Sequence, residues 1–169
     1  SSGGLKAEVP AVPIPVAETK RIPHPATQSH IQSAYPGLRR SDPDYFPLLV
    51  GNHILGGGGF VSRLMEEVRQ KRGLAYSVYS FFAPYKEQGP FQIGLQTKKE
   101  QSEEALALTQ KVLKEFVASG PTEEELLAAK QNIIGGFPLR IDSNSKILSF
   151  LSMIGFYNLP LTYLTDYLV

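Results

Sequence analysis

One continuous stretch, GGGGFVSRLMEEVRQKRGLAY from Gly56 to Tyr76, holds a glycine run, an apolar helical pattern and the start of a strand. Its apolar residues recur at the spacing of one helix face, and they are Val61, Leu64, Met65 and Val68. Arg69 follows at the edge of this face, where its stem can be buried while its guanidinium reaches a cleft. We expect Arg69 and Tyr76 to project toward one cleft. Donors fixed in this way suit a carbonyl whose oxygen gains negative charge, because they need no reorganisation during reaction.

The glycine run, Gly56 to Gly59, follows a helical pattern rather than a strand, and the phosphate-loop motif Gly-x-x-x-x-Gly-Lys-Ser/Thr is missing. We therefore interpret the run as a helix end and a tight corner that needs positive φ angles. Exposed glycine backbone also allows an extended ligand to approach closely. The candidate peptide-binding residues are Gly57, Gly58, Gly59 and Phe60.

Upstream of the glycines the sequence predicts a strand and then a helix. The strand covers residues 28–35 and is stopped by Pro36 and Gly37, a turn pair. The sequence Ser-Asp-Pro-Asp at residues 41–44 predicts a helix start with a capping side chain, and the helix should continue to the glycines. Pro47 falls within the first turn, where its missing N–H costs little.

Downstream, residues 74–82 and 91–95 have strand character and are joined by a hairpin loop at residues 84–90. A long amphipathic helix carries Ala105, Leu108, Val112 and Phe116, and Gly120 should end it. Thr122 and Glu125 form a capping box that opens the next helix, which Gly135, Gly136 and Pro138 should break. A further helix is expected over residues 145–157. This order predicts an α+β fold with helices mostly on one face of a sheet.

The composition supports one domain with a sizeable core, since 42% of the 169 residues are hydrophobic. The net charge of +1 gives no electrostatic reason to expect nucleic acid or an anionic membrane as a partner. No cysteine is present, which excludes disulfides and cysteine-bound zinc but fits either cytoplasm or periplasm. Residues 1–19, with three prolines, read as an extended linker, and we expect the chain to be a piece of a longer protein.

The chain offers no complete catalytic centre of its own. Its three histidines, His24, His30 and His53, are scattered, and neither zinc motif, His-x-x-Glu-His or His-Glu-x-x-His, occurs. We expect no catalytic zinc here. No Gly-x-Ser-x-Gly motif marks a nucleophile, and the acidic residues have structural roles in capping or on a solvated helix face; these are Asp42, Asp44, Glu66 and Glu67. From the residues alone, packing is the favoured role for Arg69 and Tyr76.

A family resemblance changes this balance. The segments Asn52-His-Ile-Leu-Gly56, Ser62-Arg-Leu64 and Arg72-Gly-Leu-Ala-Tyr-Ser77 resemble the second homologous domain of the pitrilysin-type M16 metallopeptidases. The resemblance continues upstream through Tyr35-Pro-Gly37 and Asp42-Pro-Asp-Tyr45, and downstream from Pro121 to Lys130. It covers roughly residues 20–169, which would make this range a second M16 domain, truncated at its C-terminus. The fold it implies is a two-layer domain with a mixed, mainly antiparallel sheet.

The resemblance also implies a division of labour. In that family the first domain carries zinc and the His-x-x-Glu-His motif, and the second closes over an extended or unfolded peptide. Arg69 would then hold a substrate carbonyl, and Tyr76 would donate a hydrogen bond to the oxyanion. The chain would be the zinc-free half of a metalloendopeptidase, inactive alone and completed by a zinc-bearing domain, fused or separate. Its substrate would add as a strand along a sheet edge.

Two other functions stay open at this point. Some relatives in the family are non-proteolytic structural subunits, so the chain could be a scaffold that keeps only the fold. It could also be a stand-alone peptide-binding module.

Overall fold

The structure is a computed structural model, and it describes residues 7–166 of the chain. The elements in chain order are β1 (Gln28–Pro36), α1 (Tyr45–Asn52), the π-helical turn η1 (His53–Gly57), the 3-10 turn η2 (Gly59–Val61), the π-helical turn η3 (Met65–Gln70), β2 (Ser77–Phe82), β3 (Pro90–Lys98), the 3-10 turn η4 (Lys99–Gln101), α2 (Ser102–Ser119), α3 (Glu123–Gly136), the 3-10 turn η5 (Phe137–Arg140), α4 (Asn144–Tyr157) and α5 (Tyr163–Asp166). Helices therefore accompany a small sheet, as predicted.

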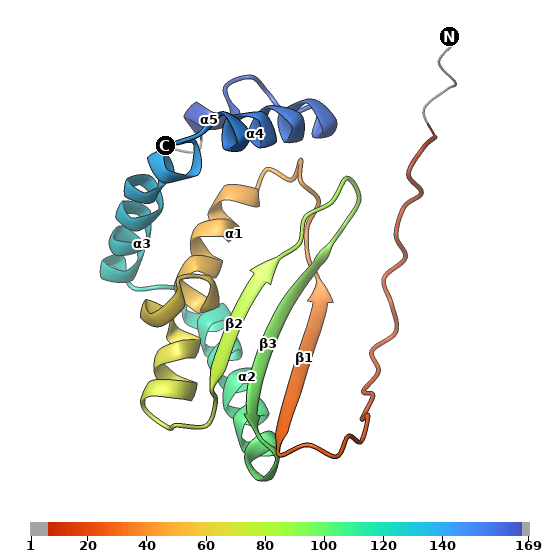
Figure 1. Cartoon of the computed structure of the whole chain (residues 1–169), viewed down its shortest axis with the longest axis vertical. Coiled ribbons are helices and arrows are strands. Elements are labelled where there is room, and N and C mark those ends of the chain that lie inside the picture. Colours follow the sequence, from red (N-terminus) through yellow and green to blue (C-terminus); the bar gives the residue numbers. More distant parts are fainter. Residues whose placement is uncertain (1–6, 167–169) are drawn as a thin grey trace.

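The sheet has three strands in the order β1-β3-β2, and both ladders are antiparallel (Figure 1). Gln28 pairs with Lys98 at one end of the β1–β3 ladder, and the two strands of the β2–β3 hairpin pair from Ser77 to Phe82. A parallel pairing occurs as an isolated bridge between Arg39 and Tyr85. The predicted mainly antiparallel sheet is confirmed.

The helices cover one face of this sheet, and burial alternates along the strands accordingly. Val78, Ile93 and Leu95 point inward and are buried, whereas Tyr79 and Phe81 point outward and are exposed. The main core joins the sheet to η1, η3 and α2, and its buried members are Leu55, Leu64, Val68, Leu74, Ala75, Val78, Phe91, Ile93, Leu95, Ala105 and Val112. Because the helices lie on one face of the sheet, its other face is left without a helical cover.

A second, smaller core lies beyond the sheet, where α3 and η5 meet α1 and α5. Ile133 and Phe137 are buried there, and Phe46, Leu49 and Leu164 pack against them. Figure 1 places α4 and α5 at the end of the molecule above α1. No helix within residues 7–166 is long and apolar enough to cross a membrane.

The start of α1 differs from the prediction. No side chain caps the helix at Asp44; instead, the carboxylate of Asp42 accepts a hydrogen bond from the Asp44 N–H at 3.0 Å. Aspartate often bonds the backbone two residues on, so Asp42 forms a turn before the helix rather than a cap. The helix begins at Tyr45, which puts Pro47 in the first turn as expected.

The helix predicted around residues 61–68 also differs in detail. Val61 belongs to the 3-10 turn η2 and its side chain is 78% exposed, so it is not part of the buried face. Leu64 and Val68 are fully buried, as predicted. The segment then winds as a π-helix from Met65, and this wider winding changes the spacing that the sequence pattern assumed.

The remaining elements follow the prediction closely. β1 extends one residue beyond the predicted strand, and α2 ends at Gly120, whose φ of 69° only glycine adopts easily. The capping box of Thr122 and Glu125 is present in both directions. One detail was wrong: α3 continues through Gly135 and Gly136, which were predicted to break it, and ends before Pro138.

The predicted division of the chain at residue 19 stays a prediction. Residues 7–27 contain no helix or strand and are exposed, and Figure 1 shows them as an extended segment beside the sheet. Residues 1–6 of the predicted linker and residues 167–169 of the predicted domain lie outside the described part of the chain.

Candidate functional site

Tyr76 lies at the entrance to β2, and its backbone is held by β3. Its N–H donates to the carbonyl of Gln96 at 2.8 Å. The carbonyl of Leu74, two residues before Tyr76, accepts a hydrogen bond of 2.5 Å from the buried hydroxyl of Thr97 in β3. Regular β2 pairing starts only at Ser77, three residues later than predicted, because Leu74 and Ala75 are drawn into the core. The backbone around Tyr76 is thus fixed on both sides.

The side chain of Tyr76 is not fixed in the same way. It is 47% exposed, and its hydroxyl has no hydrogen-bond partner within residues 7–166. A phenol held by a rigid backbone and left free at its tip can donate a hydrogen bond to a bound molecule.

Arg69 lies near the end of η3 and is partly buried. Its guanidinium lies 5.1 Å from the ring centre of Phe60, and one of its nitrogens is 3.9 Å from the sulfur of Met65. No carboxylate within the described residues pairs with it. The stacking on Phe60 holds the guanidinium in place.

Phe60 connects Arg69 to the glycine run. Its ring is 67% exposed, and its carbonyl accepts a hydrogen bond from the side chain of Gln70 at 2.9 Å. Arg69 and Gln70 therefore both bind the residue that follows the glycines. The structure brings together two of the predicted site residues, Phe60 and Arg69. No hydrogen bond joins Arg69 to Tyr76 in the described part of the chain; the turn at Gly73, with φ of 63°, connects their two segments.

The glycines serve the predicted purpose in part, since η1 ends at Gly57 and a corner with positive φ follows at Gly59. Only Gly59 has a positive φ, of 65°. A Cβ on Gly56 would lie 2.7 Å from the backbone nitrogen of Ser80, and a Cβ on Gly57 or Gly58 would come within 2.6 Å of atoms of α1 or η1. Gly56 and Gly58 thus require glycine because backbone atoms approach closely, whereas the nearest atom to a Cβ on Gly57 is the side-chain amide of Asn52. Gly57 and Gly59 are exposed, as the prediction of a ligand-accessible backbone requires.

The outer edge of β2, beside this site, is partly occupied. The side-chain amide of Asn52 donates to the carbonyl of Ser80 at 3.2 Å, and the hydroxyl of Ser80 donates back to Asn52 at 2.7 Å. At this position a protein side chain already makes the hydrogen bond that an added peptide strand would make. No sequence pattern predicts this contact.

A second arginine, Arg63, has a structural role instead. Its guanidinium forms a two-pronged ion pair with Glu125 at 2.6 Å and also donates to the carbonyl of Gly120. The hydrogen bonds that Arg63 donates lower the pKa of Glu125 to about 2. Neither spacing nor periodicity relates two residues so far apart in the chain, so sequence reasoning missed this contact.

The histidines do not form a metal site. His24 lies in the N-terminal segment, His30 on the outward face of β1 and His53 at the start of η1. No group of three or more His, Asp or Glu side chains suited to a metal occurs within residues 7–166. Burial, and then the charge of Arg140, lowers the pKa of His53. The donor set of the described chain therefore does not fit zinc.

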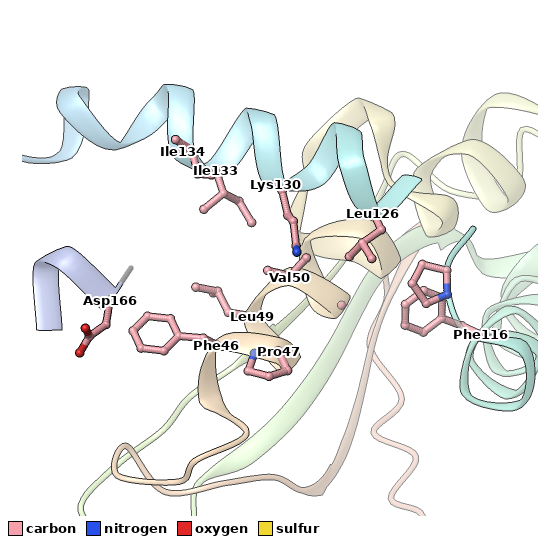
Figure 2. A pocket seen from close by; sticks show the side chains of 12 residues that line it. Phe46, Pro47, Leu49, Val50, Phe116, Leu126, Lys130, Ile133, Ile134 and Asp166 are labelled. Atoms are coloured by element: carbon pink, nitrogen blue, oxygen red, sulfur yellow. The ribbon is translucent and has the colours of Figure 1, made fainter. Parts of the chain in front are cut away.

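An apolar cavity of about 480 Å³ lies away from these residues, between α1 and α3. Figure 2 shows Leu126, Lys130 and Ile133 of α3 pointing toward Leu49 and Val50 of α1. None of the predicted site residues lines this cavity. The cavity lies beside the second core and is separate from the cleft expected at Arg69 and Tyr76.

Comparison with known proteins places the chain. A family model described as the peptidase M16 inactive domain matches residues 3–133. This chain belongs to the peptidase M16 family. The match covers the glycine run, η3 and the whole sheet, so the elements that carry the candidate site are all within the inactive M16 domain.

Individual relatives agree with this assignment. An M16 inactive domain from Pseudomonas fluorescens superposes with a TM-score of 0.81 at 49% sequence identity, covering 86% of this chain and 34% of that one. A non-peptidase homolog, YmxG, from Helicobacter pylori is 41% identical over 63% of this chain. An uncharacterized zinc protease, YmxG, from Bacillus subtilis is 34% identical over 71% of it. This M16 chain spans 25% and 29% of the length of these two curated relatives.

Proposed function

We propose that this chain is the zinc-free half of an M16 metalloendopeptidase, which closes over an extended peptide and stabilises the oxyanion formed during hydrolysis. The observation that carries the proposal is the state of Tyr76. Its backbone is anchored to β3, whereas its hydroxyl is exposed and unpaired in the described structure. A donor on an anchored backbone, with its hydroxyl free to bind, suits oxyanion stabilisation.

Arg69 has a complementary part in this proposal. Its guanidinium carries a charge that no described carboxylate neutralises, and Phe60 limits its movement. It can donate to the carbonyl of a bound peptide and hold the backbone while Tyr76 acts on the reacting carbonyl. The exposed glycine backbone at Gly57 and Gly59 leaves room for the peptide beside it.

The metal and the base that activates water come from another domain in this proposal. The described residues contain no ligand set for zinc, so a zinc-bearing M16 domain, fused or separate, must supply both. Zinc there would provide an activated water. The residues of this chain contribute the opposite wall of the site, where they bind and orient the peptide.

The test is peptidase activity on an internally quenched peptide, measured for this chain mixed with a zinc-bearing M16 domain. We expect activity only in the mixture. Tyr76→Phe should lower kcat by about 10²–10³, the usual cost of removing one oxyanion donor, and should change KM little. Tyr85→Phe removes another exposed phenol, in the loop between β2 and β3, and should leave kcat unchanged.

The second candidate function is a scaffold without proteolytic activity. It is favoured by one observation, that the Helicobacter pylori relative is described as a non-peptidase homolog. Under this function Tyr76→Phe leaves the activity of the assembled complex at the wild-type level, or the mixture shows no activity at all. Either result would reject the proposed oxyanion role.

A further inference from the structure

The outward face of the sheet is uncovered and lacks formal charge over its three central rows. The paired outward positions are His30–Gln96–Ser77, Gln32–Gly94–Tyr79 and Ala34–Gln92–Phe81. No Asp, Glu, Lys or Arg occurs among these nine residues. In a chain with 20% charged residues, the face is a neutral, amide-rich surface.

The middle row is organised around a glycine. The ring of Tyr79 lies across Gly94, so closely that a Cβ on Gly94 would be 2.6 Å from the Tyr79 hydroxyl. That hydroxyl accepts a hydrogen bond of 3.4 Å from the side chain of Gln32, on the far strand. One side chain therefore spans the sheet from β2 over β3 to β1. The missing side chain at Gly94 allows the ring to lie flat.

Phe81 extends this aromatic surface along β2. Its ring is nearly parallel to that of Tyr79, with an angle of 22° and 6.1 Å between ring centres. Tyr79 is 42% exposed and Phe81 38% exposed. Two flat aromatic faces therefore lie side by side on a surface with no charge and no covering helix. We call Tyr79 and Phe81 the aromatic platform.

Covering a glycine stabilises a sheet, and that is one role of Tyr79. It does not account for Phe81, which covers no glycine and lies outward on the uncovered face. The position of the platform suggests a second role. Tyr79 is three residues beyond Tyr76, which directly precedes β2, and this separation corresponds to roughly 10 Å at about 3.3 Å per residue of extended chain. An extended peptide with its reacting carbonyl at Tyr76 can therefore reach the platform with a side chain a few residues away.

We propose that the aromatic platform binds an apolar side chain of an extended peptide substrate and disfavours an acidic one at the same place. This inference rests on the proposed function, since it assigns a substrate preference to the same site. Aromatic faces gain from contact with apolar groups, and their negative faces repel a carboxylate. The neutral surroundings offer no cation to offset the cost of removing an acidic side chain from water.

The test is equilibrium binding of fluorescein-labelled extended peptides to the full 169-residue chain, followed by fluorescence anisotropy. Each peptide exists in two forms that differ by Leu or Glu at one position, and the position is moved along the peptide. We expect one position at which the Leu peptide binds at least about fivefold more tightly. The double variant Tyr79→Ala with Phe81→Ala should remove that difference by weakening the Leu peptide.

Two further variants separate recognition from folding. Tyr79→Phe keeps the ring over Gly94 and should bind like the wild type, and Tyr85→Ala, an exposed aromatic away from the platform, should also have no effect. The proposal is overturned if the Leu and Glu peptides bind equally at every position. It is also overturned if the double variant, folded by circular dichroism, keeps the preference, or if the wild-type chain binds no peptide at about 1 mM.

This experiment needs no hydrolysis, so its outcome is independent of the peptidase test. If the chain prefers the Leu peptide but never supports cleavage, the proposed role of the platform stands and the oxyanion role is rejected. If the chain supports Tyr76-dependent cleavage but shows no preference, the oxyanion role stands and the proposed role of the platform is rejected.

Discussion

The geometry of Tyr76 depends on one buried hydroxyl. Thr97 is fully buried in β3 and donates to the carbonyl of Leu74, two residues before Tyr76. Leu74 lies before the regular β2 pairing, so no ladder hydrogen bond at that carbonyl follows from the strand. Thr97 therefore acts as a positioning residue for the candidate oxyanion donor.

We expect Thr97→Val, which keeps the shape and removes the hydroxyl, to leave the Leu74 carbonyl buried without this partner. The free energy of unfolding should fall by about 1–3 kcal/mol, measured by urea denaturation. In the complex with a zinc-bearing domain, kcat should fall more than KM rises, because the position of Tyr76 is relaxed. Thr97→Ser should restore both.

The matched control is Thr109→Val. Thr109 is also buried, but its hydroxyl donates to the carbonyl of Ala105, four residues earlier in the same helix. That carbonyl keeps its helical partner when the hydroxyl is removed, so the loss of stability should be below that of Thr97→Val. Equal losses in the two variants would contradict the special role of Thr97.

At the level of elements, the junction between η3 and α3 is an ion pair combined with a helix cap. Glu125 accepts from the Thr122 N–H as part of the capping box and from Arg63 at the same time. Arg63 also lies over the ring of Phe116, so one guanidinium connects α2, α3 and the segment before η3. The side chains of Arg63 and Glu125 are 23% and 31% exposed. Because both side chains are partly buried, this ion pair should contribute more to stability than a fully exposed one.

This junction predicts a dependence of stability on pH. The pKa of Glu125 is lowered from 4.5 to about 2 in the folded chain, chiefly by hydrogen bonds from Arg63. A lowered folded pKa stabilises the folded state above about pH 4.5, and this contribution is lost as pH falls toward 2. Wild-type chain should therefore lose more unfolding free energy between pH 6 and pH 3 than Glu125→Gln, measured by urea denaturation at each pH.

Glutamine keeps the capping box, so Glu125→Gln removes the charge and little else. Glu124→Gln changes the neighbouring exposed carboxylate, which has no ion pair among the described residues, and should show the wild-type pH profile. Identical profiles for wild type and Glu125→Gln would contradict a role of this ion pair in stability.

At the scale of the whole molecule, the helical layer and the sheet approach each other closely at Gly56. The backbone of Ser80 in β2 approaches this glycine. The side-chain amide of Asn52 also makes two hydrogen bonds with Ser80, one to its carbonyl and one from its hydroxyl. The approach also sets the position of the glycine run relative to β2, and therefore of Phe60 relative to Tyr76. Packing between the layers is thus linked to the candidate site.

Gly56→Ala should be destabilising by more than about 1 kcal/mol, because its methyl group would overlap the backbone of Ser80, which cannot move without shifting β2. Thermal unfolding followed by circular dichroism measures the change. Gly135→Ala is the control: its Cβ would meet no atom within 4 Å, and alanine favours a helix interior, so this variant should be up to about 1 kcal/mol more stable. A neutral Gly56→Ala would show that the two layers do not constrain each other here.

Much of the architecture could be predicted from local patterns. The capping box at Thr122, the end of α2 at Gly120 and the three strands were all predicted near their observed positions. These features depend on residues close in the chain, whose backbone preferences act locally. The exposure of Val61 and the π-helical winding from Met65 were not predictable, because a periodic pattern assumes regular α-helical spacing.

The sequence by itself determined the order of elements and the M16 domain to which they belong, and it predicted Arg69 and Tyr76 as donors. The tertiary structure alone decided which glycines are required by packing, that Phe60 holds Arg69, that Arg63 pairs with Glu125, and that Tyr79 lies across Gly94. The physical reason is the range of each interaction. Turns, caps and periodicity depend on neighbours along the chain, whereas close approach and ion pairing depend on which segments the folded core brings together.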